Sequence, residues 1–373
     1  MNIGIDAKWY YSGPPSGVNV VRNIVNALIK KNKTDNIVFF LSKRDGYMEQ
    51  DFINKIKHNK KMSLLFVNSS INFFTNTLFF PFYFRKLNLD VILFQNYIPI
   101  WGVKKVKCVD YVHDFLFFDY PQYFTRLERF IFRFMKYSVL KSDHVITISN
   151  SERNRILKIC NIRKDKVSYV YHGLDSIFYE RNEDIKCNIK NKYSLPKDFI
   201  LYVGRLNIRK NIKSLLISFS KQSSTSISLV IVGDLDNQGF DILEYVKVLG
   251  IDKKVHFLGF LSDKDLSEVV ASAKIFVFPS FAEGFGLPPL EAMKSGVPTI
   301  VSNSTSLPEV CGEAALSFDP SNVDELTSLM NILLNNEKVY KEYKVKGLKR
   351  AKEFSWETNI TVILQILTKV MQG

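Results

Sequence analysis

Residues 274–303, KIFVFPSFAEGFGLPPLEAMKSGVPTIVSN, show the pattern of a strand, a loop, a helix and a second strand. The apolar runs at 274–280 and 298–303 lack polar alternation, which is typical of strands buried on both faces of a parallel sheet. Pro288 and Pro289 suit the first turn of a helix, because the N–H groups that they lack would have no helical partner there. The stretch therefore predicts one unit of an α/β fold.

The same alternation runs through the whole chain in two series. Apolar runs that predict strands lie at 1–7, 36–42, 63–68, 90–95, 107–114 and 144–149, and again at 199–205, 228–234, 254–260, 274–280 and 298–303. Helical segments separate these runs, and such alternation predicts doubly wound parallel sheets. Since 373 residues exceed the size of one hydrophobic core, we expect two Rossmann-like domains that face a central cleft, where such sheets bind ligands.

The domain boundaries follow from composition. The polar segment 179–198 predicts a linker, which places an N-terminal domain at 1–180 and a C-terminal domain at 181–355. Residues 356–373 predict a final amphipathic helix, capped by Ser355 and crossing back to the N-terminal domain.

Composition excludes several classes of protein. No apolar run is long enough for a transmembrane helix, and the first residues read as a strand rather than a signal peptide, so we expect a cytoplasmic protein. The four cysteines lie far apart without metal-ligand spacing, which argues against zinc or a disulfide framework. No cofactor is expected.

Glu283 and Glu291 flank the turn of the opening stretch, the first at the end of the strand and the second in the first turn of the helix. Gly284 and Gly286 let the backbone approach a ligand closely, and a helix N-terminus attracts phosphate. Because carboxylates bind hydroxyl groups well, the spacing favours a ligand with hydroxyls at both ends and phosphates between them. Two ordinary surface glutamates are the alternative.

Two further segments place chemistry at the ends of strands. Arg205 ends one run, and Lys210 follows where a helix starts, so that two cations suit a diphosphate. Gly13 and Gly17 lie in the loop between the first strand and a helix, where backbone amides could approach a phosphate. That loop does not match G-x-G-x-x-G, so a dinucleotide fingerprint is poorly supported.

Six segments carry a resemblance to a known family: SGVNVVRNIVNAL (16–28), VHDFLFFDYPQYF (112–124), VGRLNIRKN (203–211), VHFLGFLSDKDL (255–266), FVFPSFAEGFGLPPLEAMKSGVPTIVSNSTSLPEV (276–310) and AALSFDP (314–320). Together they resemble the retaining nucleotide-sugar glycosyltransferases of the GT-B fold, specifically the large family 4 group. The resemblance covers nearly the whole chain and is strongest over 199–320. It implies that the first domain binds the acceptor and the second binds the nucleotide sugar.

The resemblance also implies a role for each matching residue. Glu283 would contact hydroxyls of the donor sugar, and Glu291 would hold the ribose. Arg205 and Lys210 would bind the diphosphate, over which the glycine loop near the N-terminus would close. These assignments agree with the chemistry argued from the residues alone.

Backbone groups and one histidine complete the implied donor site. The base would rest on the backbone around Phe260 and Leu261, and amides from Phe285 to Leu287 would contribute beside the two glycines of the turn. His113, which ends an apolar strand, would lie beside the donor sugar. The expected catalytic residues are His113, Glu283, Arg205 and Lys210.

No metal is expected in this site. The resemblance implies this, because GT-B enzymes generally use cations and helix dipoles in place of a metal. It also implies that the departing phosphate takes the acceptor proton, so that the protein mainly stabilises developing charge. Asp234 with Asp236, and Asp263 with Asp265, resemble the metal-binding Asp-x-Asp of another glycosyltransferase fold. The first pair ends a strand, however, and the second reads as a polar turn that caps a helix.

The first half of the chain is basic, with 27 lysines and arginines against 15 acidic residues up to residue 180 and 24 against 22 afterwards. Segment 124–141 predicts a helix with one cationic stripe (Arg126, Arg129, Arg133, Lys136) and one apolar stripe (Leu127, Phe130, Ile131, Phe134), and 72–86 adds aromatic residues. Such a helix suits an anionic membrane surface, and the alternative is a core helix with a solvated back. Nucleic-acid binding is not expected, because no recognition module is visible.

The sequence thus predicts a retaining, metal-independent hexosyltransferase. It would move a hexose from a nucleotide diphosphate sugar to a glycan or a polyprenyl-diphosphate-linked saccharide, in bacterial O-antigen or polysaccharide synthesis. Attachment would be peripheral, at the inner face of the cytoplasmic membrane. Mannose from GDP-mannose is the first choice of donor. A UDP-sugar or dTDP-sugar donor, a UDP-sugar 2-epimerase of the same fold and a non-catalytic partner subunit are the alternatives.

Overall fold

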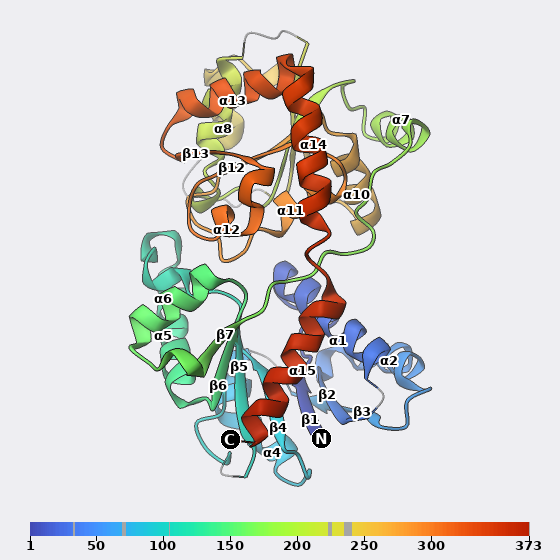
Figure 1. Ribbon diagram of the computed structural model, residues 1–373, viewed down its shortest axis with the longest axis vertical. Coiled ribbons are helices and arrows are strands. Elements are labelled where there is room, and N and C mark those ends of the chain that lie inside the picture. The colour runs from blue at the N-terminus through green and yellow to red at the C-terminus, as the bar shows by residue number, and fades with distance from the viewer. Residues whose placement is uncertain (33, 69–71, 104, 223–225, 235–240, 373) are drawn as a thin grey trace. The chain divides into compact units, whose positions relative to one another are not determined.

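The computed structural model describes the chain except for residues 33, 69–71, 104, 223–225, 235–240 and 373 (Figure 1). The chain divides into two compact units, Met1–Gly173 with Ser355–Gly373 as unit 1 and Leu174–Phe354 as unit 2. Residues 174–180 were assigned to the first domain from the sequence, but they belong to unit 2, where Lys344 pairs with Glu180 at 2.9 Å.

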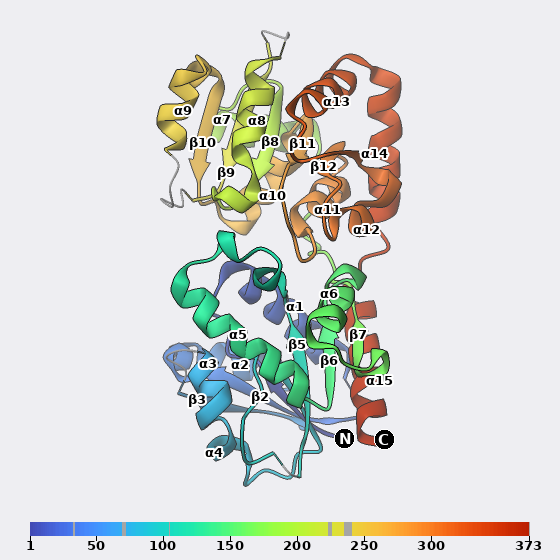
Figure 2. The same ribbon diagram turned by 90° about the vertical axis from the view of Figure 1, so that its left-hand side faces the viewer.

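Unit 1 contains a seven-stranded parallel sheet in the order β3-β2-β1-β4-β5-β6-β7. Its strands are β1 (Asn2–Asp6), β2 (Asn36–Ser42), β3 (Met62–Val67), β4 (Val91–Gln95), β5 (Lys107–Val112), β6 (His144–Thr147) and β7 (Val167–Tyr169). Its helices are α1 (Pro15–Lys31), α2 (Glu49–Ile56), α3 (Asn72–Phe74), a π-helix (Thr75–Phe79), α4 (Pro81–Phe84), α5 (Arg126–Lys141), α6 (Asn150–Cys160) and α15 (Trp356–Gln372). Figures 1 and 2 show α1 and α15 on one face of the sheet and α5 and α6 on the other.

Unit 2 repeats this arrangement with a six-stranded parallel sheet in the order β10-β9-β8-β11-β12-β13. Its strands are β8 (Phe199–Val203), β9 (Ser228–Val232), β10 (Val255–Gly259), β11 (Ile275–Phe278), β12 (Thr299–Ser302) and β13 (Leu316–Phe318). Its helices are α7 (Glu183–Lys192), α8 (Ile212–Ser220), α9 (Ile242–Val248), α10 (Asp263–Ser272), α11 (Leu287–Lys294), α12 (Leu307–Cys311), α13 (Val323–Asn335) and α14 (Glu337–Ala351). The predicted class of two doubly wound parallel-sheet domains is confirmed.

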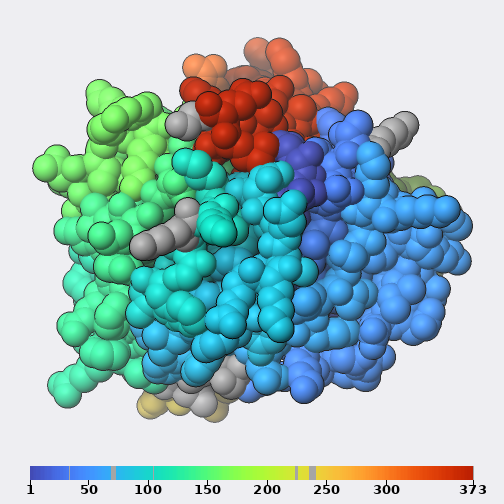
Figure 3. All heavy atoms as spheres, turned by 90° about the horizontal axis from the view of Figure 1, so that it is seen from below, coloured from blue at the N-terminus to red at the C-terminus, as the bar shows by residue number. Residues whose placement is uncertain are grey.

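The C-terminal helix α15 is built into unit 1. Ile360, Ile363 and Leu367 are fully buried, and a buried side chain of this size stabilises the fold by about 1.5–3 kcal/mol. Asn359 Nδ2 donates to the Tyr171 carbonyl at 2.7 Å. On the face shown in Figure 3, the red atoms of this helix lie against the dark blue N-terminal residues, and the Thr368 hydroxyl donates to Met1 Sδ at 3.5 Å.

Three local expectations differ from the structure. The segment taken as a linker contains α7, which the Asn182 side chain caps and which buries Ile189. The three-residue strands β7 and β13 were missed. Helix α11 begins at Leu287 and has no acidic residue in its first turn, so Glu291 lies one turn later than expected.

Candidate active site

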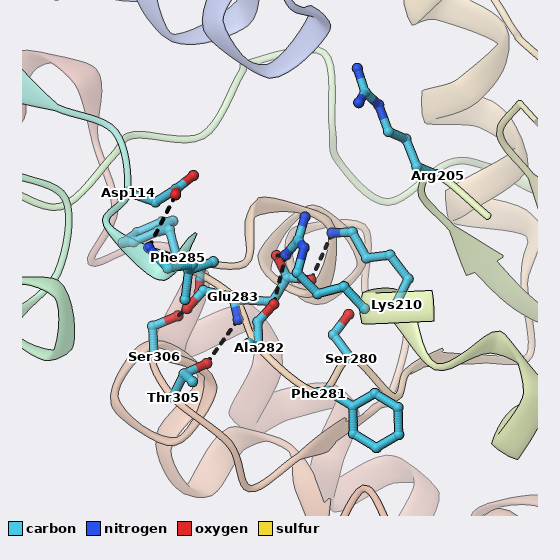
Figure 4. A network of polar contacts seen from close by, with 12 residues as sticks. Asp114, Arg205, Lys210, Ser280, Phe281, Ala282, Glu283, Phe285, Thr305 and Ser306 are labelled. Atoms are coloured by element: carbon cyan, nitrogen blue, oxygen red, sulfur yellow. Dashed lines mark hydrogen bonds and ion pairs between the residues drawn. The ribbon is translucent and has the colours of Figure 1, made fainter. Parts of the chain in front are cut away.

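The loop that follows β11 is held in place by hydroxyl groups from the loop that follows β12. Thr305 Oγ1 accepts a hydrogen bond from the Glu283 amide at 2.8 Å. The buried Ser306 hydroxyl lies 2.9 Å from the carbonyls of both Glu283 and Phe285, to which it can donate. Figure 4 shows these side chains below the loop. The carboxyl ends of two adjacent parallel strands therefore fix the backbone on both sides of Glu283.

Glu283 meets two cations from the loop after β8. Lys210 Nζ donates to one carboxylate oxygen at 2.7 Å, and Arg209 Nη1 donates to the other at 3.1 Å. The side chains are largely buried, with 9% of Glu283 and 12% of Lys210 exposed. Arg209 also donates to the Ala282 carbonyl at 2.6 Å, which ties the two loops together.

These contacts set the charge of the cluster. Burial by itself raises the pKa of Glu283, but Lys210 and Arg209 outweigh burial and hold the pKa at about 2. Burial lowers the pKa of Lys210 to about 8, against the opposing effect of Glu283. At neutral pH the site therefore presents an ionised carboxylate, whose oxygens accept hydrogen bonds from hydroxyl groups, beside a net positive charge that suits an anion.

Arg205 is not part of this cluster. Its side chain is exposed beyond the end of β8, and Figure 4 shows it extending away from Lys210 and Glu283. The sequence analysis paired Arg205 with Lys210, whereas the structure brings Arg209 to the carboxylate. The role of Arg205 in binding the diphosphate stays a prediction.

Glu291 lies in the second turn of α11 and is buried. Burial, with smaller contributions from Asp175 and Asp263, raises its pKa to about 8. Glu291 is thus largely protonated at neutral pH, unlike Glu283. The two predicted glutamates occupy opposite electrostatic environments.

The start of α11 requires a glycine. Gly286 has φ = 110°, and a Cβ atom there would lie 2.6 Å from Leu307 Cδ2. This conformation directs the chain into the helix at Leu287, beside the buried Phe285. Gly284 is part of the same loop. Because α11 begins at Leu287, the backbone amides from Phe285 to Leu287 lie at its N-terminus.

Phe260 and Leu261 follow β10, the edge strand of the unit 2 sheet. Phe260 is exposed and Leu261 is buried. The residues from 235 to 240, which include Asp236 of the first Asp-x-Asp pair, lie outside the described part of the chain. Asp265 of the second pair accepts hydrogen bonds from Lys192 and from the Tyr193 hydroxyl at 2.7 Å.

His113 lies in unit 1, directly after β5. Its Nε2 is 2.8 Å from Gln95 Oε1, and its ring contacts those of Trp9 and Tyr111, with centroids 5.4 and 5.3 Å away. Burial lowers the pKa of His113 to about 4, so the ring is neutral at pH 7. A neutral imidazole can accept or donate a hydrogen bond without adding charge.

The glycine loop packs against Trp9. A Cβ atom at Gly13 would lie 2.7 Å from Trp9 Cδ1, and one at Gly17 would lie 2.7 Å from Trp9 Cε3. Gly17 belongs to the first turn of α1. The close packing of Trp9 is therefore enough to explain why both positions are glycine, whether or not the loop approaches a phosphate.

The part of the chain that the structure describes contains no group of three or more histidine, cysteine, aspartate or glutamate residues able to hold a metal ion. The sequence analysis missed five residues that the structure places around the predicted ones: Arg209, Thr305, Ser306, Trp9 and Gln95. Arg209 lies four residues after Arg205, in the loop that follows the same predicted strand. Its place after that strand is the one sequence signal that could have identified Arg209.

Comparisons with known proteins identify the family of the chain. The family model described as Glycosyltransferase Family 4 matches residues 17–177, and the model described as Glycosyl transferases group 1 matches residues 186–350. The matches correspond to unit 1 and unit 2 in turn.

Relatives of the chain include two mannosyltransferases of Escherichia coli. Serotype-specific mannosyltransferase WbdA is 32% identical over 240 residues, 62% of this chain and 29% of that protein. O-antigen chain mannosyltransferase B is 31% identical over 260 residues, which make up 68% of each protein. The chain thus spans less than a third of the first relative and about two thirds of the second.

The fold is also that of a solved enzyme. Sucrose-phosphate synthase from Thermosynechococcus elongatus superposes with a TM-score of 0.77 at 19% identity, covering 100% of this chain and 99% of the other. At this identity the likeness concerns the fold alone.

Proposed function

Because the chain belongs to the family 4 glycosyltransferases, we propose that it transfers a hexosyl group from a nucleotide diphosphate sugar to a glycan or a polyprenyl-diphosphate-linked saccharide, with retention of configuration. The observation that carries the proposal is the buried Glu283 carboxylate, which two cations hold at the carboxyl ends of a parallel sheet. The names of the relatives support mannose as the sugar and O-antigen synthesis as the setting. GDP-mannose stays our first choice of donor.

The proposed reaction breaks the bond between the sugar anomeric carbon and the diphosphate oxygen. The acceptor hydroxyl oxygen forms the new bond on the same face, and its proton passes to the departing phosphate. Glu283 binds donor-sugar hydroxyls, while Lys210 and Arg205 neutralise charge that develops on the diphosphate. Because protein cations supply this neutralisation, we expect transfer to continue in the presence of a metal chelator.

Glu283→Ala tests the proposal directly. The variant should lose at least about 100-fold in kcat/KM for transfer, since it removes a group that contacts the reacting sugar. Glu244→Gln, which changes an exposed carboxylate on α9, is the matched control and should transfer normally. Unchanged transfer by Glu283→Ala would remove the central claim.

The donor and the alternative activities need separate measurements. A thermal-shift comparison of GDP, UDP, dTDP and CMP identifies the base, because a ligand at about 100 times its Kd adds about 2.7 kcal/mol of stability. A 2-epimerase would convert the nucleotide sugar into its 2-epimer without an acceptor, whereas a transferase releases the free nucleotide together with a glycosylated acceptor. A non-catalytic subunit would bind a nucleotide and catalyse neither epimerisation nor transfer.

An exposed surface of unit 1 supports binding to an anionic bilayer. Leu127 and Phe130 of α5 are 68% and 51% exposed, and Arg133 lies over the Phe130 ring at 4.7 Å. The apolar stripe predicted for α5 is therefore split, because Ile131 and Phe134 pack against the core. The described residues contain no helix long and apolar enough to cross a membrane.

The surface extends from α5 to the neighbouring helices. Phe130 contacts Phe134, which contacts Phe73 at a centroid distance of 5.0 Å, and Phe73 leads to the exposed Phe74. Further exposed apolar side chains of this region are Leu78, Phe79, Phe82, Ile100 and Trp101. Aromatic groups beside arginines are typical of proteins that bind at a membrane interface.

Co-sedimentation with vesicles tests this surface. We expect binding to vesicles that contain an anionic lipid at low salt, weaker binding at high salt, and loss of binding in the Leu127→Ser, Phe130→Ser double variant. Tyr47→Ser, at another exposed aromatic residue, is the control. If the protein binds neither anionic nor zwitterionic vesicles at low salt, the proposed membrane binding of this surface is wrong.

A further inference from the structure

The His113 ring is held by a hydrogen bond and by two aromatic contacts within unit 1. Its backbone amide donates to Asn96 Oδ1 at 3.0 Å, and its Nε2 lies 2.8 Å from Gln95 Oε1. The Trp9 and Tyr111 rings pack against it. The ring therefore has little freedom to turn, and its hydrogen-bonding state depends on which atom of Gln95 faces it.

Contacts to Asp6 determine the orientation of the Gln95 amide. Gln95 is 2% exposed, and its Nε2 donates to the Asp6 carbonyl at 3.4 Å. If the amide were reversed, its oxygen would face that carbonyl oxygen, and neither atom carries a hydrogen. The Gln95 oxygen must then face His113, and an acceptor in front of Nε2 requires the hydrogen to be on Nε2.

A buried network anchors Asp6 itself. Asn76, which lies in the π-helix, donates to Asp6 Oδ2 at 2.9 Å and accepts from Lys8 Nζ at 2.6 Å. Lys8 pairs with the other Asp6 oxygen, and all three side chains are at most 2% exposed. The Gln95 backbone amide donates to Asp6 Oδ2 at 3.4 Å, so this buried network also holds the backbone from which the Gln95 side chain extends. A π-helix inside a fold is frequently found at a functional site.

We propose that Gln95 is a positioning residue that holds His113 as the Nε2–H tautomer and leaves Nδ1 as the hydrogen-bond acceptor of the ring. The functional consequence rests on the proposed function: His113 accepts a hydrogen bond from a donor-sugar hydroxyl at Nδ1. The other tautomer would present an N–H there and repel a hydroxyl that approaches as a donor. Gln95 acts through His113 and does not contact the substrate.

Nitrogen-15 NMR of the imidazole groups in the unliganded protein tests the tautomer without any activity measurement. His113→Asn identifies the signals of His113. We expect a protonated Nε2 and an unprotonated Nδ1 at pH 7, and the Nδ1–H form would overturn the proposal. This result does not depend on whether the protein is a transferase.

Gln95→Leu and Gln95→Glu test the positioning role. In Gln95→Leu we expect both tautomers of His113 in the spectrum. We also expect kcat to fall about tenfold while the protein stays folded. Gln95→Glu places a carboxylate on Nε2–H, which should raise the pKa of His113 by about 1–3 units and give transfer a new dependence on pH near neutrality. Among the described residues, Asp6, Tyr111 and His172 are titratable groups that contact the ring or act on its charge, and these variants leave them in place.

Gln222→Leu is the matched control, because it removes a glutamine amide from unit 2. It should leave the His113 spectrum and the pH profile of transfer unchanged. A Gln95→Leu protein that keeps one His113 tautomer and the wild-type pH profile would refute the positioning role. If the wild-type protein shows no transfer while its tautomer is as proposed, the proposed function fails and the assignment of Gln95 stands.

Discussion

Arg205 and Arg209 share one loop but differ in environment. Arg209 donates to the buried Glu283 carboxylate, whereas Arg205 is exposed. We predict that Arg209→Leu lowers the free energy of unfolding by about 3 kcal/mol, because it removes a partner of a buried charge. Arg205→Leu should change it by less than about 0.5 kcal/mol while weakening nucleotide binding. Chemical denaturation and nucleotide titration of both variants measure the two effects.

The opposite result would reassign the two arginines. If Arg205→Leu binds nucleotide normally and Arg209→Leu loses binding with full stability, then Arg209 contacts the ligand and Glu283 does not depend on it for charge balance. Lys210→Leu serves as the reference, since Lys210 contacts the same carboxylate at 2.7 Å.

Glu291 predicts a pH dependence of nucleotide binding. Its pKa is raised to about 8, so the free protein holds a proton that a ribose-binding carboxylate must release. Affinity should therefore rise with pH up to about 8 and level off above it, with up to about tenfold change per pH unit below. Calorimetry in buffers of different ionisation enthalpy counts the released protons.

A variant pair isolates this effect. Glu291→Gln should abolish proton release and the pH slope, while Glu313→Gln, at an exposed carboxylate, should keep both. Binding without proton release in the wild-type protein would mean that a neutral Glu291 donates its hydrogen to the ribose.

Sequence reasoning identified Glu283 and Lys210 at strand ends, but it missed Arg209 and the uncharged residues that position the predicted ones. Glu283 and Lys210 follow apolar runs, so their place at the edge of a sheet was predictable. Thr305 and Gln95 act through contacts to distant segments, and nothing in their local sequence reveals these contacts. The opposite environments of Glu283 and Glu291 likewise depend on burial and on neighbours from other elements.

At the scale of elements, the junction of β1 and α1 depends on Trp9. Gly17→Ala in α1 would gain up to about 1 kcal/mol in helix propensity, but its Cβ atom would lie 2.7 Å from the indole. We expect the clash to outweigh the gain, with a net loss of about 1–2 kcal/mol in the free energy of unfolding. Thermal unfolding measures the difference.

A double-mutant cycle separates the clash from other effects. Adding Gly17→Ala to Trp9→Leu should cost nothing or stabilise, because the indole is gone. Gly46→Ala is the control, since no atom lies within 4 Å of its added Cβ. Equal destabilisation of the wild-type protein and Trp9→Leu by Gly17→Ala would show that the indole is not the cause.

Elements with a strong apolar pattern were predictable, and those defined by tertiary pairing were not. The run at 36–42 became β2 with the same bounds, and the run at 199–205 became β8, which ends two residues earlier, at Val203. The edge strands β7 and β13 have three residues each, too few to show a pattern. Helix α7 reads as a polar linker because Ile189 is the one residue that it buries among those described.

At the scale of the whole molecule, the predicted donor contacts are divided between the units. Base, ribose and most of the diphosphate are assigned to unit 2, whereas the sugar is assigned to Glu283 of unit 2 and His113 of unit 1. The glycine loop after β1 is the one part of unit 1 assigned to the diphosphate. The two family models match one unit each, and the assignment of these contacts to the units stays a prediction.

Hydrogen exchange can test this division in the intact chain. A nucleoside diphosphate at about 100 times its Kd should slow amide exchange by up to about 100-fold in the segments 204–211 and 279–287, because it stabilises the state in which they are closed. Residues 113–118 should exchange at the unliganded rate until the nucleotide sugar replaces the free nucleotide, since His113 is assigned to the sugar. Protection of 113–118 by the nucleotide alone, equal to that of 279–287, would contradict the assignment. Glu283→Gln should retain the protection given by the nucleotide and lose the additional protection given by the sugar.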